Sequence, residues 1–279
     1  LLSVRTVRKE SDMKRITSAR CINCIPEVVP KKRSNNKKLK LLITNKRIDW
    51  GFKQSILMIQ SRLQQIMRRT GDKVLLITST IPAEGKTMTS VNMALAFAQE
   101  GMKVALLDGD LRKPSVSELM KLPEGPGLTE YFRGESTPEE IQVVKDGVTF
   151  FRAGQKKGKV SGLIDEEKMN SLLEKLRKEY DVILMDAAPS YVFSDAMILS
   201  SYADKVLYVV RVDKADAKEI RVGMNSFEEK EKLIGYVINR DTGGYISQSG
   251  YGYGRYGKYQ KYRKYAELDE ETMNTEDTL

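Results

Sequence analysis

Short apolar runs alternate along this chain with longer segments in which apolar residues recur at helical spacing. The runs predict strands over residues 74–79, 103–107, 148–152, 182–185, 205–211 and 233–238. The helical pattern predicts helices over residues 48–69, 87–100 and 163–180. Strands that are apolar almost throughout are typical of a parallel sheet covered by helices on both faces. We therefore expect an α/β fold with a mostly parallel sheet, whose ligands bind at the carboxyl ends of the strands.

The two ends of the chain lack this alternation. Residues 1–45 show little periodic pattern and are expected to form a flexible N-terminal arm. Residues 243–265 hold seven of the 13 tyrosines, spaced by Gly, Lys, Arg, Ser and Gln, and an acidic end follows. Such a composition cannot build a core. We predict a basic, juxtamembrane-like arm over 1–45, a catalytic domain over 46–242 and a flexible Tyr-rich tail over 243–279.

The net charge of the N-terminal part of the chain differs in sign from that of the remaining residues. Residues 1–70 carry 18 Lys/Arg and 4 Asp/Glu, a net +14, whereas the remaining residues carry 29 and 34, a net −5. The positive charge peaks at 31–40, KKRSNNKKLK, which suits an anionic lipid surface, a nucleic acid or a solvated linker. The start at Leu1 suggests a fragment of a longer protein, and it favours membrane proximity for this basic block. No run of about 18 apolar residues is present.

Cysteine chemistry does not stand out in the sequence. Cys21 and Cys24 form a lone CxxC, with no histidine and no second cysteine pair to complete a metal site. A reducing cytoplasm fits this cysteine usage.

The segment 74–87, VLLITSTIPAEGKT, predicts a phosphate-binding loop between a strand and a helix. Gly85 lets the backbone approach an anion, and the N–H groups that open the helix point at phosphate oxygens. Lys86 would neutralise the outer phosphates, and the Thr87 hydroxyl would bind Mg²⁺. The loop departs from the usual pattern because Thr80 replaces the first glycine.

Two further strands end in carboxylates. The strand at 103–107 leads into Asp108 and Asp110, where one side chain can bind Mg²⁺ and the other can accept a proton from a nucleophile. The strand at 182–185 leads into Asp186, in the manner of P-loop enzymes that place a second Mg²⁺ ligand there. Arg112 is a candidate for contact with phosphate or with a neighbouring subunit.

These three motifs, at 79–87, 105–114 and 183–189, resemble the A, A′ and B motifs of the bacterial protein-tyrosine kinases, a MinD/ParA-like branch of P-loop ATPases. The resemblance spans about residues 45–265 and implies ATP and Mg²⁺ as cofactors. It assigns Lys86 to phosphate, Asp108 to the base that deprotonates tyrosine, and Thr87, Asp110 and Asp186 to Mg²⁺. The nucleotide-binding set that it implies is Pro82, Ala83, Glu84, Gly85, Lys86, Thr87, Met88, Arg112 and Asn239.

The resemblance also implies autophosphorylation of the tail and a role in capsule or exopolysaccharide synthesis and export. The partners expected are the tail of a neighbouring subunit in a homo-oligomer, a membrane segment or transmembrane adaptor, and a tyrosine phosphatase. The location expected is the cytoplasmic face of the bacterial inner membrane. The acceptors expected are Tyr245, Tyr251, Tyr253, Tyr256, Tyr259, Tyr262 and Tyr265.

Departures from the family pattern keep other functions open. Trp50, Lys53 and Ile56 stand where an oligomerisation helix often carries Glu-x-x-Arg-x-x-Arg. An ATP-binding adaptor without kinase activity therefore remains an alternative. A MinD/ParA-like ATPase switch is another, although Ile81 replaces the lysine that often reaches across the dimer in that branch. Nucleic-acid binding by the Gly/Tyr/basic tail is disfavoured, because it leaves the three motifs without a shared role.

Overall fold

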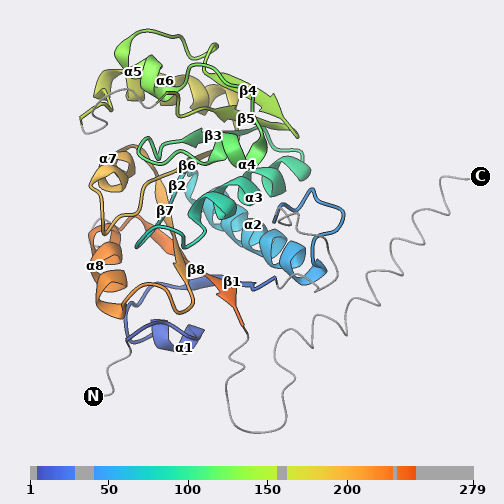
Figure 1. Ribbon diagram of the computed structural model, residues 1–279, viewed down its shortest axis with the longest axis vertical. Helices are drawn as coiled ribbons and strands as arrows, with labels where there is room; N and C mark the ends of the chain where they lie inside the picture. The colour runs from blue at the N-terminus through green and yellow to red at the C-terminus, as the bar shows by residue number, and fades with distance from the viewer. Residues whose placement is uncertain (1–4, 29–40, 156–161, 229–230, 243–279) are drawn as a thin grey trace, which may run out of the picture.

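The computed structural model describes residues 5–28, 41–155, 162–228 and 231–242 (Figure 1). The strands found there are β1 (Cys21–Pro26), β2 (Val74–Ser79), β3 (Val104–Asp108), β4 (Gln142–Lys145), β5 (Val148–Phe151), β6 (Val182–Asp186), β7 (Lys205–Arg211) and β8 (Leu233–Asp241). They form one sheet in the order β1-β8-β7-β2-β6-β3-β5-β4. Every neighbouring pair is parallel except β4 with β5. The predicted mostly parallel sheet is confirmed.

Helices cover both faces of the sheet. One apolar core lies under α2 (Trp50–Thr70), α3 (Lys86–Gln99) and α4 (Val116–Met120). The other lies under α1 (Glu10–Met13), α5 (Leu128–Arg133), α6 (Glu166–Glu179), α7 (Asp195–Tyr202) and α8 (Ala217–Glu228). Figure 1 shows α2 and α3 on one side of the strands, with α7 and α8 on the other. The fold therefore has three layers.

The first four residues of strand β2 are apolar because they face both cores. All six of its residues are buried. Val74 and Leu76 point into one core, and Leu75 and Ile77 point into the other. Because successive side chains of a strand alternate between faces, a central strand with helices on both sides favours apolar residues at neighbouring positions.

Helix α2 confirms the amphipathic pattern of its segment. Phe52, Ile56, Ile59 and Leu63 are buried, which matches one face of a helix. The helix begins where the Asp49 carboxylate accepts a hydrogen bond from the Phe52 N–H at 3.1 Å. It ends at a glycine with φ +74°.

The flexible arm predicted over residues 1–45 is wrong for the residues described there. Strand β1 pairs in parallel with β8, and Val7 and Met13 are fully buried. The physical reason is that β1 satisfies the hydrogen-bonding edge of β8, while Ile22 and Ile25 fill the core beside α2. The predicted domain boundary at residue 45 therefore does not separate an arm from the domain.

Parts of the sequence-based account lie outside the described residues. These are the basic block at 31–40 and the tail at 243–279, with its seven tyrosines. Of the helices in the described ranges, none combines the length and the apolar composition that crossing a bilayer requires.

An ion pair at the amino-terminal edge of the sheet, opposite the candidate site, fixes three segments together. The Asp204 carboxylate accepts hydrogen bonds from the N–H groups of Lys73 and Val74, both at 2.8 Å, and from the Arg177 guanidinium at 2.6 and 2.9 Å. Partial burial opposes ionisation, but the Arg177 guanidinium and the two N–H donors hold the pKa of Asp204 below its usual value.

We expect Asp204→Asn to lower the free energy of unfolding at pH 7 by about 2–3 kcal/mol, because charge-assisted hydrogen bonds are lost. Since the folded pKa is lowered, the contribution of Asp204 is present above the unfolded pKa of about 3.9 and is lost as the pH falls through the folded value. Urea unfolding across this pH range measures the effect. The exposed Asp146→Asn is the control, and equal stability of the two variants at pH 7 would refute the expectation.

Candidate functional site

The phosphate-binding loop predicted from the sequence joins β2 to α3. The loop reverses direction at Ala83 and Gly85, whose φ angles are +67° and +98°. Gly85 is the residue that precedes the first turn of α3. The unpaired N–H groups of that first turn, together with the positive end of the helix dipole, form an anion site.

Glu84 supports this loop from inside. Its carboxylate is fully buried and accepts hydrogen bonds from the N–H groups of Ile81 at 2.8 Å and Arg211 at 3.1 Å. Burial raises the pKa of Glu84 to about 7, although both N–H donors favour the ionised form. The Glu84 side chain thus joins the loop to the end of β7, and the part of Glu84 in nucleotide binding stays a prediction.

Asn239 lies against the same loop. Its side-chain amide donates a hydrogen bond to the Glu84 carbonyl at 2.7 Å and is buried. A Cβ atom added to Gly85 would lie 2.1 Å from the Asn239 Nδ2. Asn239 therefore holds the loop in place, and its contact with the nucleotide stays a prediction. Pro82 and Ala83 are exposed beside it, and Met88 is partly buried on α3.

Lys86 brings two of the predicted carboxylates together. Its ammonium lies 2.7 Å from the Asp110 Oδ2 and 3.5 Å from the Asp186 Oδ2. Burial disfavours the charged form of Lys86, but the carboxylates of Asp186 and Asp110 outweigh burial and raise its pKa. Lys86 is therefore a buried cation at the first residue of α3, directly after the loop.

Asp186 also holds two hydroxyl groups of α3. It accepts hydrogen bonds from the Thr87 Oγ1 at 2.6 Å and from the Ser90 Oγ at 3.0 Å. Ser90 was not singled out in the sequence. Its signal is its position four residues after Lys86, which puts both side chains on one face of α3.

Asp108 is a fully buried carboxyl group of the site, as Asp186 is. It pairs with Asp186 across the neighbouring ends of β3 and β6. Its Oδ2 accepts a hydrogen bond from the Val116 N–H at 3.1 Å, whereas its Oδ1 is buried without a hydrogen-bond partner among the described residues. Burial and the charge of Asp186 raise the pKa of Asp108.

These donors fit a hard divalent cation. The Thr87 hydroxyl and the carboxylates of Asp110 and Asp186 are oxygen ligands of the kind that Mg²⁺ prefers. The buried, unpartnered Oδ1 of Asp108 lies in the same acidic group. The residues present therefore suit Mg²⁺ beside a phosphate chain.

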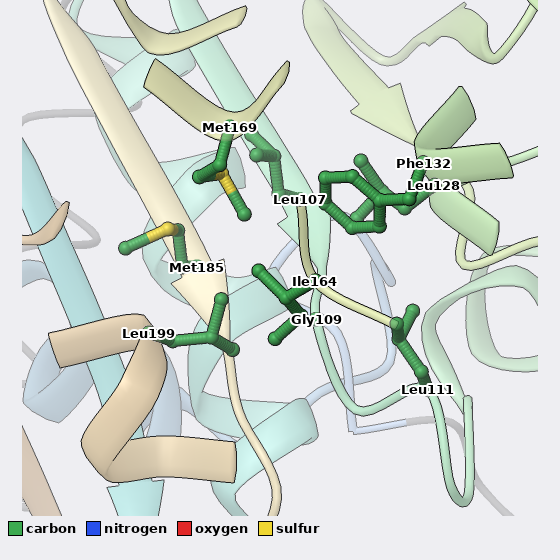
Figure 2. Close-up of a pocket in the computed structure, with 9 residues that line it drawn as sticks. All are labelled: Leu107, Gly109, Leu111, Leu128, Phe132, Ile164, Met169, Met185 and Leu199. Atoms are coloured by element: carbon green, nitrogen blue, oxygen red, sulfur yellow. The ribbon is translucent and has the colours of Figure 1, made fainter. Parts of the chain in front are cut away.

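Gly109 sets the positions of the two aspartates that flank it. Its N–H donates a hydrogen bond to the Asp186 carbonyl at 2.8 Å. A Cβ atom at Gly109 would lie 2.9 Å from the Leu199 Cδ1 and 3.0 Å from that carbonyl oxygen. Figure 2 shows the small apolar pocket around it, which is lined by Leu107, Gly109, Leu111, Leu128, Phe132, Ile164, Met169, Met185 and Leu199. The loop between β3 and α4 thus rests on a packed apolar base.

Arg112 pairs with a carboxylate of α7 in this structure. It forms an ion pair with Asp195 at the start of α7, and its guanidinium lies 4.5 Å above the ring of Phe193. The hydrogen bond with Asp195 raises the pKa of Arg112. No local sequence pattern indicates this pairing, because the partners are 83 residues apart. Contact between Arg112 and phosphate stays a prediction.

Comparisons with known proteins also indicate a P-loop nucleotide-binding protein. A family model named ParA, described as an NUBPL iron-transfer P-loop NTPase, matches residues 71–217. Tyrosine-protein kinase CpsD of Streptococcus pneumoniae is 34% identical over 184 residues, which cover 61% of this chain and 78% of that protein. Tyrosine-protein kinase ptk of Acinetobacter johnsonii is 27% identical over 198 residues, 69% of this chain but only 27% of that protein. This chain therefore spans about a quarter of the longer relatives.

A solved structure supports the fold. The kinase domain of the Escherichia coli tyrosine kinase ETK superposes with a TM-score of 0.75 and covers 89% of this chain and 98% of that domain. The sequence identity is 24%, so the likeness concerns the fold alone.

Proposed function

Because the chain belongs to the bacterial tyrosine-protein kinases, within the ParA-like P-loop NTPases, we propose that it transfers the γ-phosphoryl group of ATP to tyrosine hydroxyls. Its own C-terminal tyrosines are the first acceptors. One observation carries the proposal. Lys86 and the three aspartates at 108, 110 and 186 converge at the carboxyl ends of β2, β3 and β6, beside the start of α3.

The binding roles follow from the chemistry of each group. The N–H groups that open α3 hold the phosphates, and the Lys86 ammonium neutralises the outer ones. Thr87, Asp110 and Asp186 hold Mg²⁺, which supplies charge neutralisation on the phosphate oxygens. Glu84 and Asn239 keep the loop in the shape that this requires.

Asp108 is the base in this mechanism. A tyrosine hydroxyl has a pKa of about 10 and is almost fully protonated at pH 7. The Oδ1 of Asp108, which has no hydrogen-bond partner among the described residues, accepts the hydroxyl proton. The phenolic oxygen bonds to the γ-phosphorus while the bond between that phosphorus and the leaving oxygen of ADP breaks. Phosphoryl transfer depends chiefly on this positioning and on charge stabilisation.

The tail is the tethered substrate of a neighbouring subunit. Its tyrosines reach a concentration of roughly millimolar near an adjacent active site. Each phosphate adds roughly −1.5 to −2 charges at pH 7. Seven such groups exceed the five Lys/Arg between Arg255 and Lys264, so the tyrosine-bearing segment 243–265 changes from basic to acidic. We propose that this change loosens a homo-oligomer.

A mixing experiment tests transfer between subunits. Full-length Lys86→Met serves as the acceptor, and an active chain that ends at Gly244 serves as the donor. After incubation with Mg-ATP, phosphotyrosine is expected on the full-length acceptor only. Lys86→Met incubated alone is the control. An acceptor that stays unmodified while the wild-type chain modifies itself would overturn transfer between subunits.

The cellular role belongs to the same proposal. Capsule or exopolysaccharide synthesis and export is the process, at the cytoplasmic face of the inner membrane. A transmembrane adaptor or segment is the activating partner, and a tyrosine phosphatase is the opposing enzyme. The relatives support this by name, since one is a putative tyrosine-protein kinase in the cps region of Klebsiella pneumoniae.

We expect Gly85→Ala to weaken nucleotide binding about 10-fold, because strain of roughly 1–3 kcal/mol falls on the loop. The backbone there has φ +98°, and the new Cβ would meet Asn239. Titration with a fluorescent ADP analogue measures the affinity. The control is Gly71→Ala, which has φ +74° but no neighbouring atom within 4 Å and lies at the far end of α2. Equal affinity in both variants would refute the expectation.

A further inference from the structure

Strand β1 brings the two cysteines of the chain onto one face. In a regular strand, residues three apart point to opposite sides. Here the pairing with β8 shifts register between Cys21 and Asn23. As a result Cys21 and Cys24 both pack against the core on the α1 side, while Ile22 and Ile25 both lie in the core beside α2. A bulge of this kind re-aims side chains and is a common device near functional sites.

Helix α1 adds a carboxylate to this pair. One carboxylate oxygen of Glu10 and the sulfurs of Cys21 and Cys24 all lie within 4.8 Å of one another. Both cysteines are partly buried. The set lies at the β1 edge of the sheet, whereas the Lys86 cluster lies at the ends of the central strands. The proposed phosphotransfer therefore leaves it without a role.

The electrostatic surroundings of the cluster are acidic. The hydrogen bond with Cys21 and burial raise the pKa of the Cys24 thiol. The charges of Asp241 and Glu10 act in the same direction. Burial, together with Cys21 and Glu10, also raises the pKa of the nearby Tyr236. The carboxylates of Glu10 and Asp241 attract a cation placed among these groups.

We propose that Glu10, Cys21 and Cys24 form a binding site for Zn²⁺, with solvent as the fourth ligand. Two thiolates and one carboxylate suit this borderline-soft ion and do not suit Mg²⁺. Zn–S bonds of about 2.3 Å in a tetrahedral site require sulfur atoms about 3.8 Å apart. The ligand atoms reach such spacing from within 4.8 Å by side-chain rotation. Each thiol releases its proton to solvent on binding.

Thiol chemistry favours a metal over a redox role. Reactive cysteines lie in electropositive surroundings, whereas this pair has the acidic neighbours Glu10 and Asp241. A bound divalent cation reverses that balance, because its charge stabilises both thiolates. The pair is therefore poor as a nucleophile and suitable as a metal site.

The bound ion would join the N-terminal segment to the sheet. Glu10 belongs to α1, the cysteines belong to β1, and β1 pairs with β8. Strand β8 carries Asn239, which holds the phosphate-binding loop. Zinc would thus link α1 to β1, the edge strand next to β8. Because Zn²⁺ would bind the folded chain and not the unfolded one, it would stabilise the fold.

Cobalt absorption tests the site on the full-length, reduced chain. With only two cysteines present, a thiolate-to-Co²⁺ charge-transfer band can arise only from Cys21 and Cys24. We expect one Co²⁺ per chain with this band and its displacement by Zn²⁺. Cys24→Ser should lose the band. Glu10→Gln should bind Zn²⁺ at least 10-fold more weakly, while Glu27→Gln, a carboxylate just beyond β1, should bind as the wild type does.

Thermal unfolding gives a second measurement. Zn²⁺ should raise the melting temperature of the wild type and of Glu27→Gln by several degrees, and that of Glu10→Gln by much less. A wild-type chain that shows no thiolate band when Co²⁺ is in excess overturns the site. Equal Zn²⁺ affinity of Glu10→Gln and Glu27→Gln overturns the part assigned to Glu10. Both outcomes are read without the kinase reaction, so they are independent of the proposed function.

Discussion

Replacing Lys86 with methionine is expected to lower tyrosine phosphorylation about 10³-fold, the scale on which a single preorganised cation or donor contributes to such transfers. The ammonium lies 2.7 Å from Asp110 and 3.5 Å from Asp186. Methionine fills similar space but leaves two buried carboxylates to face the phosphates without the cation. The initial rate of phosphate incorporation, measured with radiolabelled ATP, gives the effect.

The control for Lys86→Met is Lys103→Met, an exposed lysine just before β3. It should retain the wild-type rate. Because removal of one partner of a buried ion pair also destabilises a protein, both variants are compared with the wild type by thermal unfolding. A folded Lys86→Met chain that keeps a tenth or more of the wild-type rate would contradict the assignment of Lys86 to the transferred phosphate.

Asp108→Asn is expected to lower the transfer rate by about 10²–10⁴-fold, the usual contribution of a general base, with nucleotide affinity changed less than about 3-fold. Asparagine keeps the size of the side chain and can still accept the hydrogen bond of the Val116 N–H. Its amide cannot take the tyrosine proton. Single-turnover phosphorylation and titration with a fluorescent ADP analogue separate the two quantities.

The control for Asp108→Asn is Asp146→Asn, an exposed position in the turn between β4 and β5. It should leave both quantities unchanged. If Asp108→Asn phosphorylated the tail at the wild-type rate, Asp108 would not be the base. If it lost nucleotide affinity and rate together, its role would be binding instead.

The central strands could be predicted from the sequence because each contains a run of at least four consecutive apolar residues. Strands β2 and β7 have the expected bounds, 74–79 and 205–211. The edge strands could not be found in this way. Strand β1 contains cysteines, Asn23 and a proline, and it is held by β8, more than 200 residues later. Strand β4 is partly exposed and pairs antiparallel with β5. Both depend on contacts that leave no local pattern.

The residues of the site likewise divide into those that the sequence predicts and those that only the structure shows. The aspartates at 108, 110 and 186 were predictable, because Asp108 and Asp186 end buried strands, Asp110 follows two residues after Asp108, and parallel strands end at one edge. The inward-facing carboxylate of Glu84 was not, since its partners include Arg211, 127 residues away. The third ligand beside Cys21 and Cys24 was also hidden. Glu10 reaches them only because α1 folds back onto β1, and a register shift puts both sulfurs on one face.

Intact-mass spectrometry after incubation with Mg-ATP tests the central claim most directly. The wild type is compared with Lys86→Met and with a chain that ends at Gly244. Successive additions of phosphate to the wild type alone, mapped to the tyrosines between 245 and 265, are the predicted result. ATP hydrolysis by the wild type with no change in mass would contradict it and would indicate a partner-switching ATPase.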